Sequence, residues 1–207
     1  MQRFIPKLQD HLLGRLLGRE FDGDTNGEFS DRDRNTIRMM GNRIYAVNTC
    51  RVNYTTYDVR RDQERINPRS HPDIMVRSPE SGEGASPYWY ARVIGIYHAM
   101  VSASHPDVEP KNRVVQRMEF LWVRWFGVEP SYRAGFRWAR LPKIGFVEAT
   151  DEYAFTFLDP SHIVRGCHLI PAFHGDRTSA LLPYPNSAAR ILDPTEQNDW
   201  VNLYVSM

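Results

Sequence analysis

The sequence has few cysteines and no long apolar run, and each absence excludes a class of protein. The two cysteines, Cys50 and Cys167, are too few for a disulfide framework and form no CxxC metal motif. No run of about 18 apolar residues is present, so we expect no membrane-spanning helix and no membrane partner. The first residues lack the apolar core and small-residue cleavage site of a signal peptide, which favours an intracellular location.

The sequence has little lysine: 23 of the 26 basic residues are arginines. The formal net charge is only +1, so no large field attracts the chain to nucleic acid or to a membrane. Arginine nevertheless binds phosphate and carboxylate groups better than lysine does, because its planar guanidinium can donate two hydrogen bonds to them at once. A GC-rich genome also produces an arginine-rich protein, and this is the explanation that we favour.

The local motifs of common enzyme classes are missing. The sequence has no G-x-S-x-G, no H-E-x-x-H and no P-loop, and its carboxylates are too scattered to suggest the acidic metal triad of DNA strand transfer. Cys167, His168 and His174 are close in sequence, but the first two are adjacent and no fourth ligand is near, which disfavours zinc. We therefore predict no cofactor and no catalysis. A nuclease or strand-transfer accessory enzyme remains an alternative.

One stretch matches a calcium loop. Asp22, Asp24, Asn26 and Asp33 hold positions 1, 3, 5 and 12 of an EF-hand pattern, and Gly27 holds position 6. Aspartate at position 12 reaches less far than the usual glutamate, the motif occurs once, and the same residues form an ordinary turn between helices. Calcium is thus a weak alternative, and no metal is favoured.

Hydrophobic periodicity predicts a helical N-terminus followed by strands. Leucines at helical spacing indicate an amphipathic helix over 8–20, and Ser30 with Asp33 resembles a capping box for a second helix. β-branched and aromatic residues then predict strands in six stretches: 43–59, 73–77, 88–101, 117–126, 141–149 and 153–159. The stretch 162–173 closes the apolar region. The pattern indicates a mainly β fold (α+β minor), a strongly bent sheet or small barrel with a helical arm.

The stretch 117–126 has large apolar side chains on both faces. Leu121 and Trp125 belong to one face and Phe120 to the other, so we expect this strand to be covered on both sides. Arg124 lies within it and should need a carboxylate partner. The candidate partners are Glu119, Glu129 and Asp151.

The 207 residues suit one domain with arms. We predict four segments: a helical arm over 1–42, a β segment with a polar loop over 43–87, a β-barrel over 88–173 and a C-terminal extension over 174–207.

Four short motifs within 88–170 occur in the same order as the motifs of a known domain family. They are ARV (91–93), VRWF (123–126) with EP (129–130), FTFL (155–158) and GCHL (166–169). In this order they resemble a BAH (bromo-adjacent homology) domain, which implies a small SH3-like bent β-barrel.

A second resemblance covers nearly the whole chain. The stretches CRVNYTTYDVRRDQERINPRSHPDIMV (50–76) and LPKIGFVEATDEYAFTFLDPSHIVRGCHLIPAF (141–173) are similar to a domain of CACTA-type, Plavaka-like transposon proteins of mushroom-forming fungi. This resemblance implies a nuclear, transposon-derived accessory module without catalysis. Its expected partners are chromatin, such as the nucleosome, or a protein of the transposase complex.

The BAH resemblance also implies site residues. Chromatin-reading members hold methyl-lysine in an aromatic cage through cation–π attraction. The matching cage positions are Trp89, Trp125 and Gly127, so one aromatic wall is missing. Tyr132 and Tyr153 are candidates for that wall. A tryptophan in a strand is often a core residue, and for Trp125 this alternative has equal weight.

Direct DNA binding is the other alternative. Arginines alternate with aromatic residues over 59–65 and 132–140, a composition that suits phosphate contacts and base stacking. The candidate residues are Arg60, Arg61, Arg65, Arg133, Arg137 and Arg140. A solvated loop whose arginines neutralise nearby acids would have the same composition.

Overall fold

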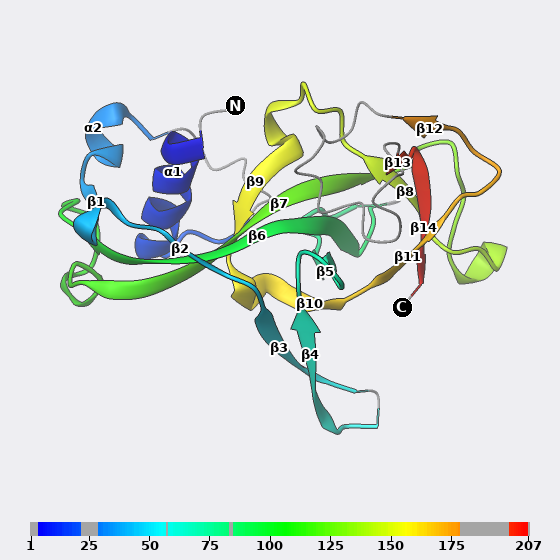
Figure 1. Ribbon diagram of the computed structural model, residues 1–207, viewed down its shortest axis with the longest axis horizontal. Helices are drawn as coiled ribbons and strands as arrows, with labels where there is room; N and C mark the ends of the chain where they lie inside the picture. The colour runs from blue at the N-terminus through cyan, green and yellow to red at the C-terminus, as the bar shows by residue number, and fades with distance from the viewer. Residues whose placement is uncertain (1–3, 22–28, 57, 83–84, 179–198, 207) are drawn as a thin grey trace.

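The chain folds around one long antiparallel hairpin (Figure 1). The computed structural model describes residues 4–21, 29–56, 58–82, 85–178 and 199–206. Strand β6 (Tyr88–Ala103) pairs with β7 (Gln116–Val128) along almost its whole length, with one bulge between Val93 and Gly95. The prediction of a mainly β fold is confirmed.

Every other strand of the ten-stranded sheet attaches to this hairpin directly or through a neighbour. The outer edge of β6 pairs with β1 (Ile37–Met39), β2 (Tyr45–Val47) and β5 (Asp73–Arg77). The outer edge of β7 pairs with β9 (Phe155–Leu158) and β8 (Lys143–Phe146). Beyond these lie β10 (Ile163–Gly166) on β5, β14 (Asn202–Ser206) on β8, and β11 (His168–Pro171) on β14. Strands from all four predicted segments thus join one sheet.

The sheet is not a closed barrel, which corrects the predicted barrel. The path of paired strands runs from β10 through β5, β6, β7, β8 and β14 to β11, and its two ends do not pair with each other among the described residues. Strands β10 and β11 are consecutive in sequence but pair with opposite ends of the path. The chain therefore crosses from one end of the sheet to the other near Cys167.

Short elements complete the described fold. Two small two-stranded sheets are formed by β3 (Cys50–Thr55) with β4 (Arg61–Ile66) and by β12 (Arg177–Thr178) with β13 (Asp199–Trp200). The 3-10 turns are η1 (Met40–Asn42), η2 (Pro110–Asn112), η3 (Phe136–Trp138), η4 (Glu152–Ala154) and η5 (Pro160–His162). No helix among the described residues has both the length and the apolar character needed to cross a bilayer.

Strand β7 is covered on both faces, as its sequence predicts. Leu121, Val123 and Trp125 lie in a core that also contains side chains of β5 and β10. Phe120 lies on the opposite face, in a core that includes the leucines of the first helix. Burial on both faces explains why this strand has apolar residues at successive positions instead of alternating with polar ones.

Helix α1 (Phe4–Leu16) covers one face of the hairpin and buries its leucines there. It ends four residues before the predicted end at residue 20. The Arg19 N–H donates to the Gly14 carbonyl and the Gly18 N–H donates to the Arg15 carbonyl, the two bonds of a Schellman motif. Gly18 has φ = 69°, a conformation that glycine adopts at little cost, so it stops the helix.

Helix α2 (Asp31–Arg34) begins with the predicted capping box. The Asp33 N–H donates to the Ser30 hydroxyl, and the Asp33 carboxylate accepts from the Ser30 N–H in return. This confirms the prediction and shows that aspartate can take the place of the usual glutamate.

Arg124 is fully buried, and none of the three predicted carboxylates pairs with it; the acidic groups that act on its charge are Asp199 and Glu148, which raise its pKa against the effect of burial. Its Nη2 donates to the Val147 carbonyl at 3.0 Å, and its guanidinium lies 4.7 Å and 4.8 Å from the ring centroids of Phe146 and Phe155. Its Nε and Nη1 have no hydrogen-bond partner among the described residues, and burial lowers its pKa to about 10. None of the three proposed partners forms an ion pair with it: Glu119, Glu129 and Asp151.

The buried His11 of α1 makes stability depend on pH. Burial, aided by the positive charge of Arg15, lowers the His11 pKa from 6.5 to about 3, and Asp159 opposes this only in part. The unfolded chain therefore takes up a proton below pH 6.5 that the folded chain does not bind. Stability should be lost as the pH falls from 6.5 toward 3, by about 1.4 kcal/mol per pH unit at most from this group.

We expect His11→Gln to flatten this acid dependence, because glutamine does not titrate. Urea unfolding at pH 7, 5 and 4 measures the difference between the two proteins. His162, whose pKa is also lowered by burial, remains in both and gives a residual slope. An identical pH dependence in both proteins would contradict the assignment to His11.

Candidate functional site

The four predicted aromatic residues line one pocket of about 660 Å³, where β6 begins and β7 ends. Trp89 comes from β6, Trp125 from β7, Tyr132 from the loop after β7, and Tyr153 from η4. Gly127, which holds the third cage position in the BAH resemblance, also lines the pocket. The fold therefore gathers these four aromatic residues, up to 64 positions apart in the sequence, around one pocket.

The two tryptophans form its deep part. The Trp125 side chain is only 6% exposed, and its indole Nε1 donates to the Thr156 hydroxyl at 2.6 Å. Trp89 is half-buried and meets Trp125 edge to face, with ring centroids 5.8 Å apart. Trp125 thus belongs both to the core and to the pocket, where its orientation is fixed by a buried hydrogen bond.

The two tyrosines lie nearer the solvent. Tyr153 is 48% exposed, and its backbone N–H donates to the Asp151 carboxylate, which caps η4. Tyr132 is half-buried and already has two cations of the chain beside it. The Arg140 guanidinium and the Lys143 ammonium each lie 5.8 Å from its ring centroid. Tyr153 is therefore more open to a ligand than Tyr132.

The charged groups that line the pocket are all acidic. Glu80, Glu129 and Asp151 are among the lining residues, and none of the described lining residues is lysine, arginine or histidine. Sequence reasoning did not predict that these three acidic residues lie at the site. The Asp151 position had one local signal, an aspartate at the start of a short turn, whereas Glu80 reaches the pocket only through the folded loop after β5.

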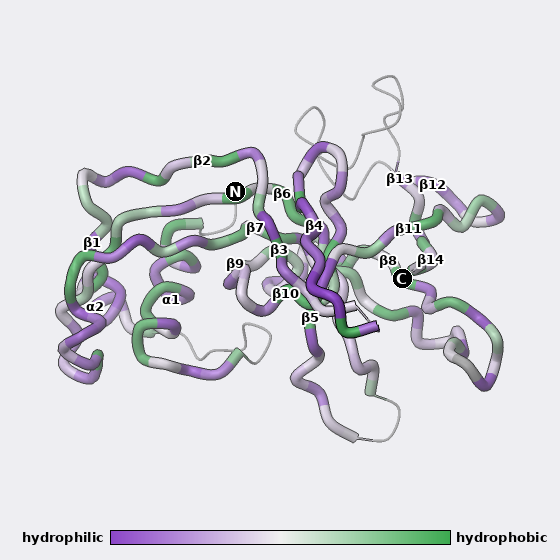
Figure 2. Tube along the Cα trace, turned by 90° about the horizontal axis from the view of Figure 1, so that it is seen from below, coloured by the Kyte–Doolittle hydropathy of each residue, from purple (hydrophilic) through white to green (hydrophobic). Residues whose placement is uncertain are grey.

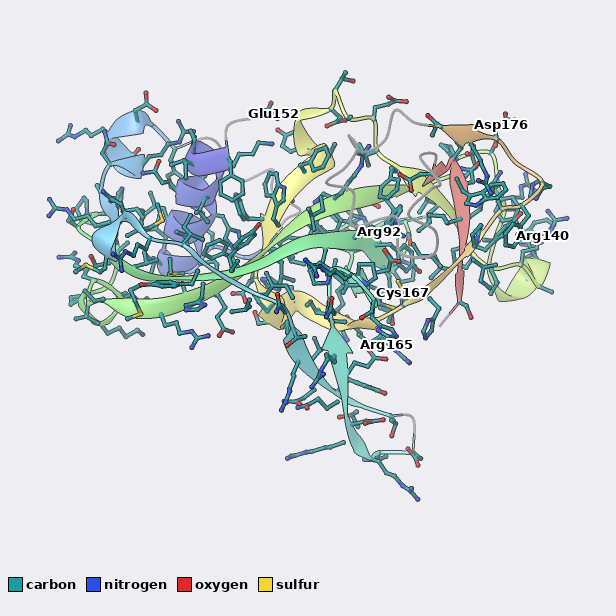
Figure 3. The ribbon with its side chains drawn as sticks, viewed as in Figure 1. Arg92, Arg140, Glu152, Arg165, Cys167 and Asp176 are labelled. Carbon is teal, nitrogen blue, oxygen red and sulfur yellow. The ribbon has the colours of Figure 1, made fainter. Side chains whose placement is uncertain are left out.

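The six candidate arginines lie in two separate places. Those of 59–65 belong to the β3–β4 ribbon, whereas those of 132–140 belong to the loop after β7, where Figure 3 labels Arg140 well away from the ribbon. In that loop the guanidiniums of Arg133 and Arg137 lie 5.2 Å and 5.7 Å from the Trp138 ring centroid. The six arginines do not form one surface. All of them are exposed, namely Arg60, Arg61, Arg65, Arg133, Arg137 and Arg140.

The candidate calcium ligands Asp22, Asp24 and Asn26 lie outside the described residues. Asp33 is described, and the hydrogen bond from the Ser30 hydroxyl is the main cause that lowers its pKa. Within the described part of the chain, no group of three or more His, Cys, Asp or Glu side chains is placed to hold a metal.

Neither cysteine has an activated thiol. Burial raises the pKa of Cys167, and the carboxylate of Asp73 raises it further. Burial likewise raises the pKa of Cys50. A raised pKa lowers the fraction of reactive thiolate at neutral pH.

We expect Thr156→Val to destabilise the protein by about 1–3 kcal/mol, because it leaves the buried indole N–H of Trp125 without an acceptor. Urea unfolding monitored by near-UV circular dichroism measures the loss. The matched control is Thr150→Val, since Thr150 is exposed. Equal effects of the two substitutions would mean that the Trp125–Thr156 hydrogen bond does not stabilise the pocket.

Comparisons of this chain with protein-family models, with curated proteins and with solved structures find no match. The resemblances to BAH domains and to the transposon-associated domain therefore stay predictions.

Proposed function

We propose that this protein is a non-catalytic docking module that receives a cationic side chain of a partner protein in its aromatic pocket. The observation that carries the proposal is the composition of the pocket wall. Trp89, Trp125 and Tyr153 supply ring surfaces, and the only charged groups among the described lining residues are carboxylates. A lysine or methylated lysine is the side chain that this chemistry suits best.

Two attractions act on such a ligand. The faces of the tryptophan and tyrosine rings attract an ammonium group, and the attraction grows when both are shielded from water. The carboxylates of Glu80, Glu129 and Asp151 add a long-range attraction for positive charge. Ligand pockets of roughly 300–1,000 Å³ bury a whole small ligand. A pocket of about 660 Å³ therefore has room for a side chain together with parts of its neighbours.

The resemblance supports a partner in the nucleus. Chromatin-reading BAH domains, which the motifs of 88–170 resemble, bind methyl-lysine, and the transposon-associated domain belongs to proteins that act on DNA. We propose a transposon-derived nuclear accessory module, whose partner is a histone tail in the nucleosome. A lysine-rich protein of the transposase complex is the alternative partner, because its lysine side chains have the same cationic group as those of a histone tail.

We expect Trp89→Ala to weaken partner binding by about tenfold or more, a loss of at least about 1.4 kcal/mol, while the domain stays folded. Fluorescence anisotropy with labelled histone-tail peptides, unmodified and trimethylated at single lysines, measures the affinity. The matched control is Trp138→Ala, because Trp138 is 43% exposed and does not line the pocket. Near-UV circular dichroism checks the fold of each variant.

Two results would contradict the proposal. One is an equal effect of the Trp89 and Trp138 substitutions on binding. The other is that no lysine peptide, modified or not, binds the wild-type chain. Loss of the folded state in Trp89→Ala would assign Trp89 to the core, and Tyr153→Ala, at an exposed position, then becomes the decisive variant.

A further inference from the structure

The hairpin of β3 and β4 forms a two-stranded ribbon that projects from the body of the molecule (Figure 1). Most of its length has the hydrophilic colour in Figure 2, unlike the strands of the hairpin β6–β7. The two strands are in register over all six residue pairs from Cys50↔Ile66 to Thr55↔Arg61. Alternate pairs share a face, so the ribbon has two distinct sides.

One side of the ribbon is used by the fold. Val52 and Ile66 are buried there in the core that includes Ile163 of β10. Glu64 on the same side accepts a hydrogen bond from the Gly166 N–H and lies 3.5 Å from the Arg165 guanidinium. These contacts fix the ribbon to the edge of the main sheet.

The other side is exposed and basic. It carries the cross-strand pairs Arg51↔Arg65, Asn53↔Gln63 and Thr55↔Arg61, and all six side chains are exposed. No carboxylate belongs to this side, and among the described residues none of its three arginines forms an ion pair. Two like charges directly opposite each other, as in the pair of Arg51 and Arg65, are unfavourable in an isolated ribbon. A polyanion would remove that penalty.

The amide pair adds groups that can distinguish bases. Gln63 Nε2 donates to Asn53 Oδ1 at 2.8 Å, which orients both amides between the arginines. Among the described residues, the side-chain amides of Asn53 and Gln63 form no other hydrogen bond. The N–H groups of Asn53 therefore remain as donors, and the carbonyl oxygen of Gln63 as an acceptor, at the centre of the basic side.

We propose that this side of the ribbon enters the major groove of duplex DNA. That groove admits a two-stranded β-ribbon, and each class of side chain on this face has a partner there. Arginine donates to the O6 and N7 atoms of guanine, asparagine or glutamine pairs with adenine, and threonine contacts the thymine methyl group. Arginines near the groove edge also neutralise phosphates.

Duplex DNA fits these observations better than other polyanions. The major groove of A-form RNA is too deep and narrow for side chains to contact the bases. An acidic protein surface would satisfy the arginines but gives no reason for an oriented amide pair between them. Arg60, at the tip of the ribbon, is engaged by Asp58 at 3.1 Å and is not part of this face.

The inference is independent of the proposed function. The residues of the ribbon face do not line the aromatic pocket, and the pocket is acidic where the ribbon is basic. A loss of DNA binding with intact peptide binding would concern the ribbon alone, and the reverse would concern the pocket alone.

The test is fluorescence anisotropy with the full chain and a short labelled DNA duplex of mixed sequence, over a range of salt concentrations. We expect the variant Arg51→Ala/Arg61→Ala/Arg65→Ala to bind at least about tenfold more weakly. Its slope of log affinity against log salt should be less steep by about 1 for each arginine that no longer neutralises a phosphate, so by up to about 3. The matched control Arg133→Ala/Arg137→Ala/Arg140→Ala removes the same charge from the other arginine group and should stay within about twofold of wild type.

A charge-neutral variant separates base contacts from general attraction. Selection from a randomised duplex pool first defines the sequence preferred by the wild-type chain. Asn53→Ala/Gln63→Ala should then lose preference for that duplex over a scrambled one, while its salt slope remains that of wild type. Near-UV circular dichroism verifies that each variant is folded, which exposed positions should allow.

Any of three results would overturn the inference. The first is that the wild-type chain does not bind duplex DNA. The second is that the ribbon and loop variants lose the same affinity, which would assign binding to overall charge. The third is that an RNA duplex of the same sequence, or poly-glutamate, competes as well as DNA.

Discussion

The antiparallel pairing of β6 with β7 is the constraint on which the rest of the structure depends. Because β7 is apolar on both faces, the hairpin is stable only if both faces are covered. Helix α1 covers one face. Side chains of β5, β9 and β10 pack in the core on the other face. The strands outside the hairpin are short, and most of them pair with an edge that β6, β7 or a direct neighbour provides.

Two surfaces of opposite character result from this arrangement. At the end where β6 begins and β7 ends, aromatic residues and three acidic residues line one pocket. The ribbon of β3 and β4, held through Glu64 and the buried Val52 and Ile66, presents arginines and amides to the solvent. The partners that we propose, a basic protein tail and a nucleic acid, are complementary to these two surfaces. One small chain with both surfaces could hold a tail and the DNA next to it, which is the arrangement that chromatin offers.

Much of the fold was predictable from local pattern. Strand β5 matches its predicted range, Ser30 caps α2 as expected, and the two faces of β7 follow from alternation along the strand. Features set by distant partners were not predictable. The polar composition of 60–87 predicts a loop there, whereas residues 61–66 form β4, which pairs with β3. The same holds for β14, whose partners β8 and β11 come from a different part of the sequence, and for Glu80, which reaches the pocket through tertiary folding.

The most direct test of two separate binding surfaces is a pair of NMR titrations of the ¹⁵N-labelled full chain. The five tryptophan indole N–H signals and the backbone amides of 50–66 report on the pocket and the ribbon in one spectrum. A trimethyl-lysine histone peptide should shift the indole signals of Trp89 and Trp125 and leave the ribbon amides in place, and duplex DNA should do the reverse. The two-surface account would be contradicted if both ligands shifted the same set of signals, or if the peptide left the Trp89 and Trp125 signals unmoved.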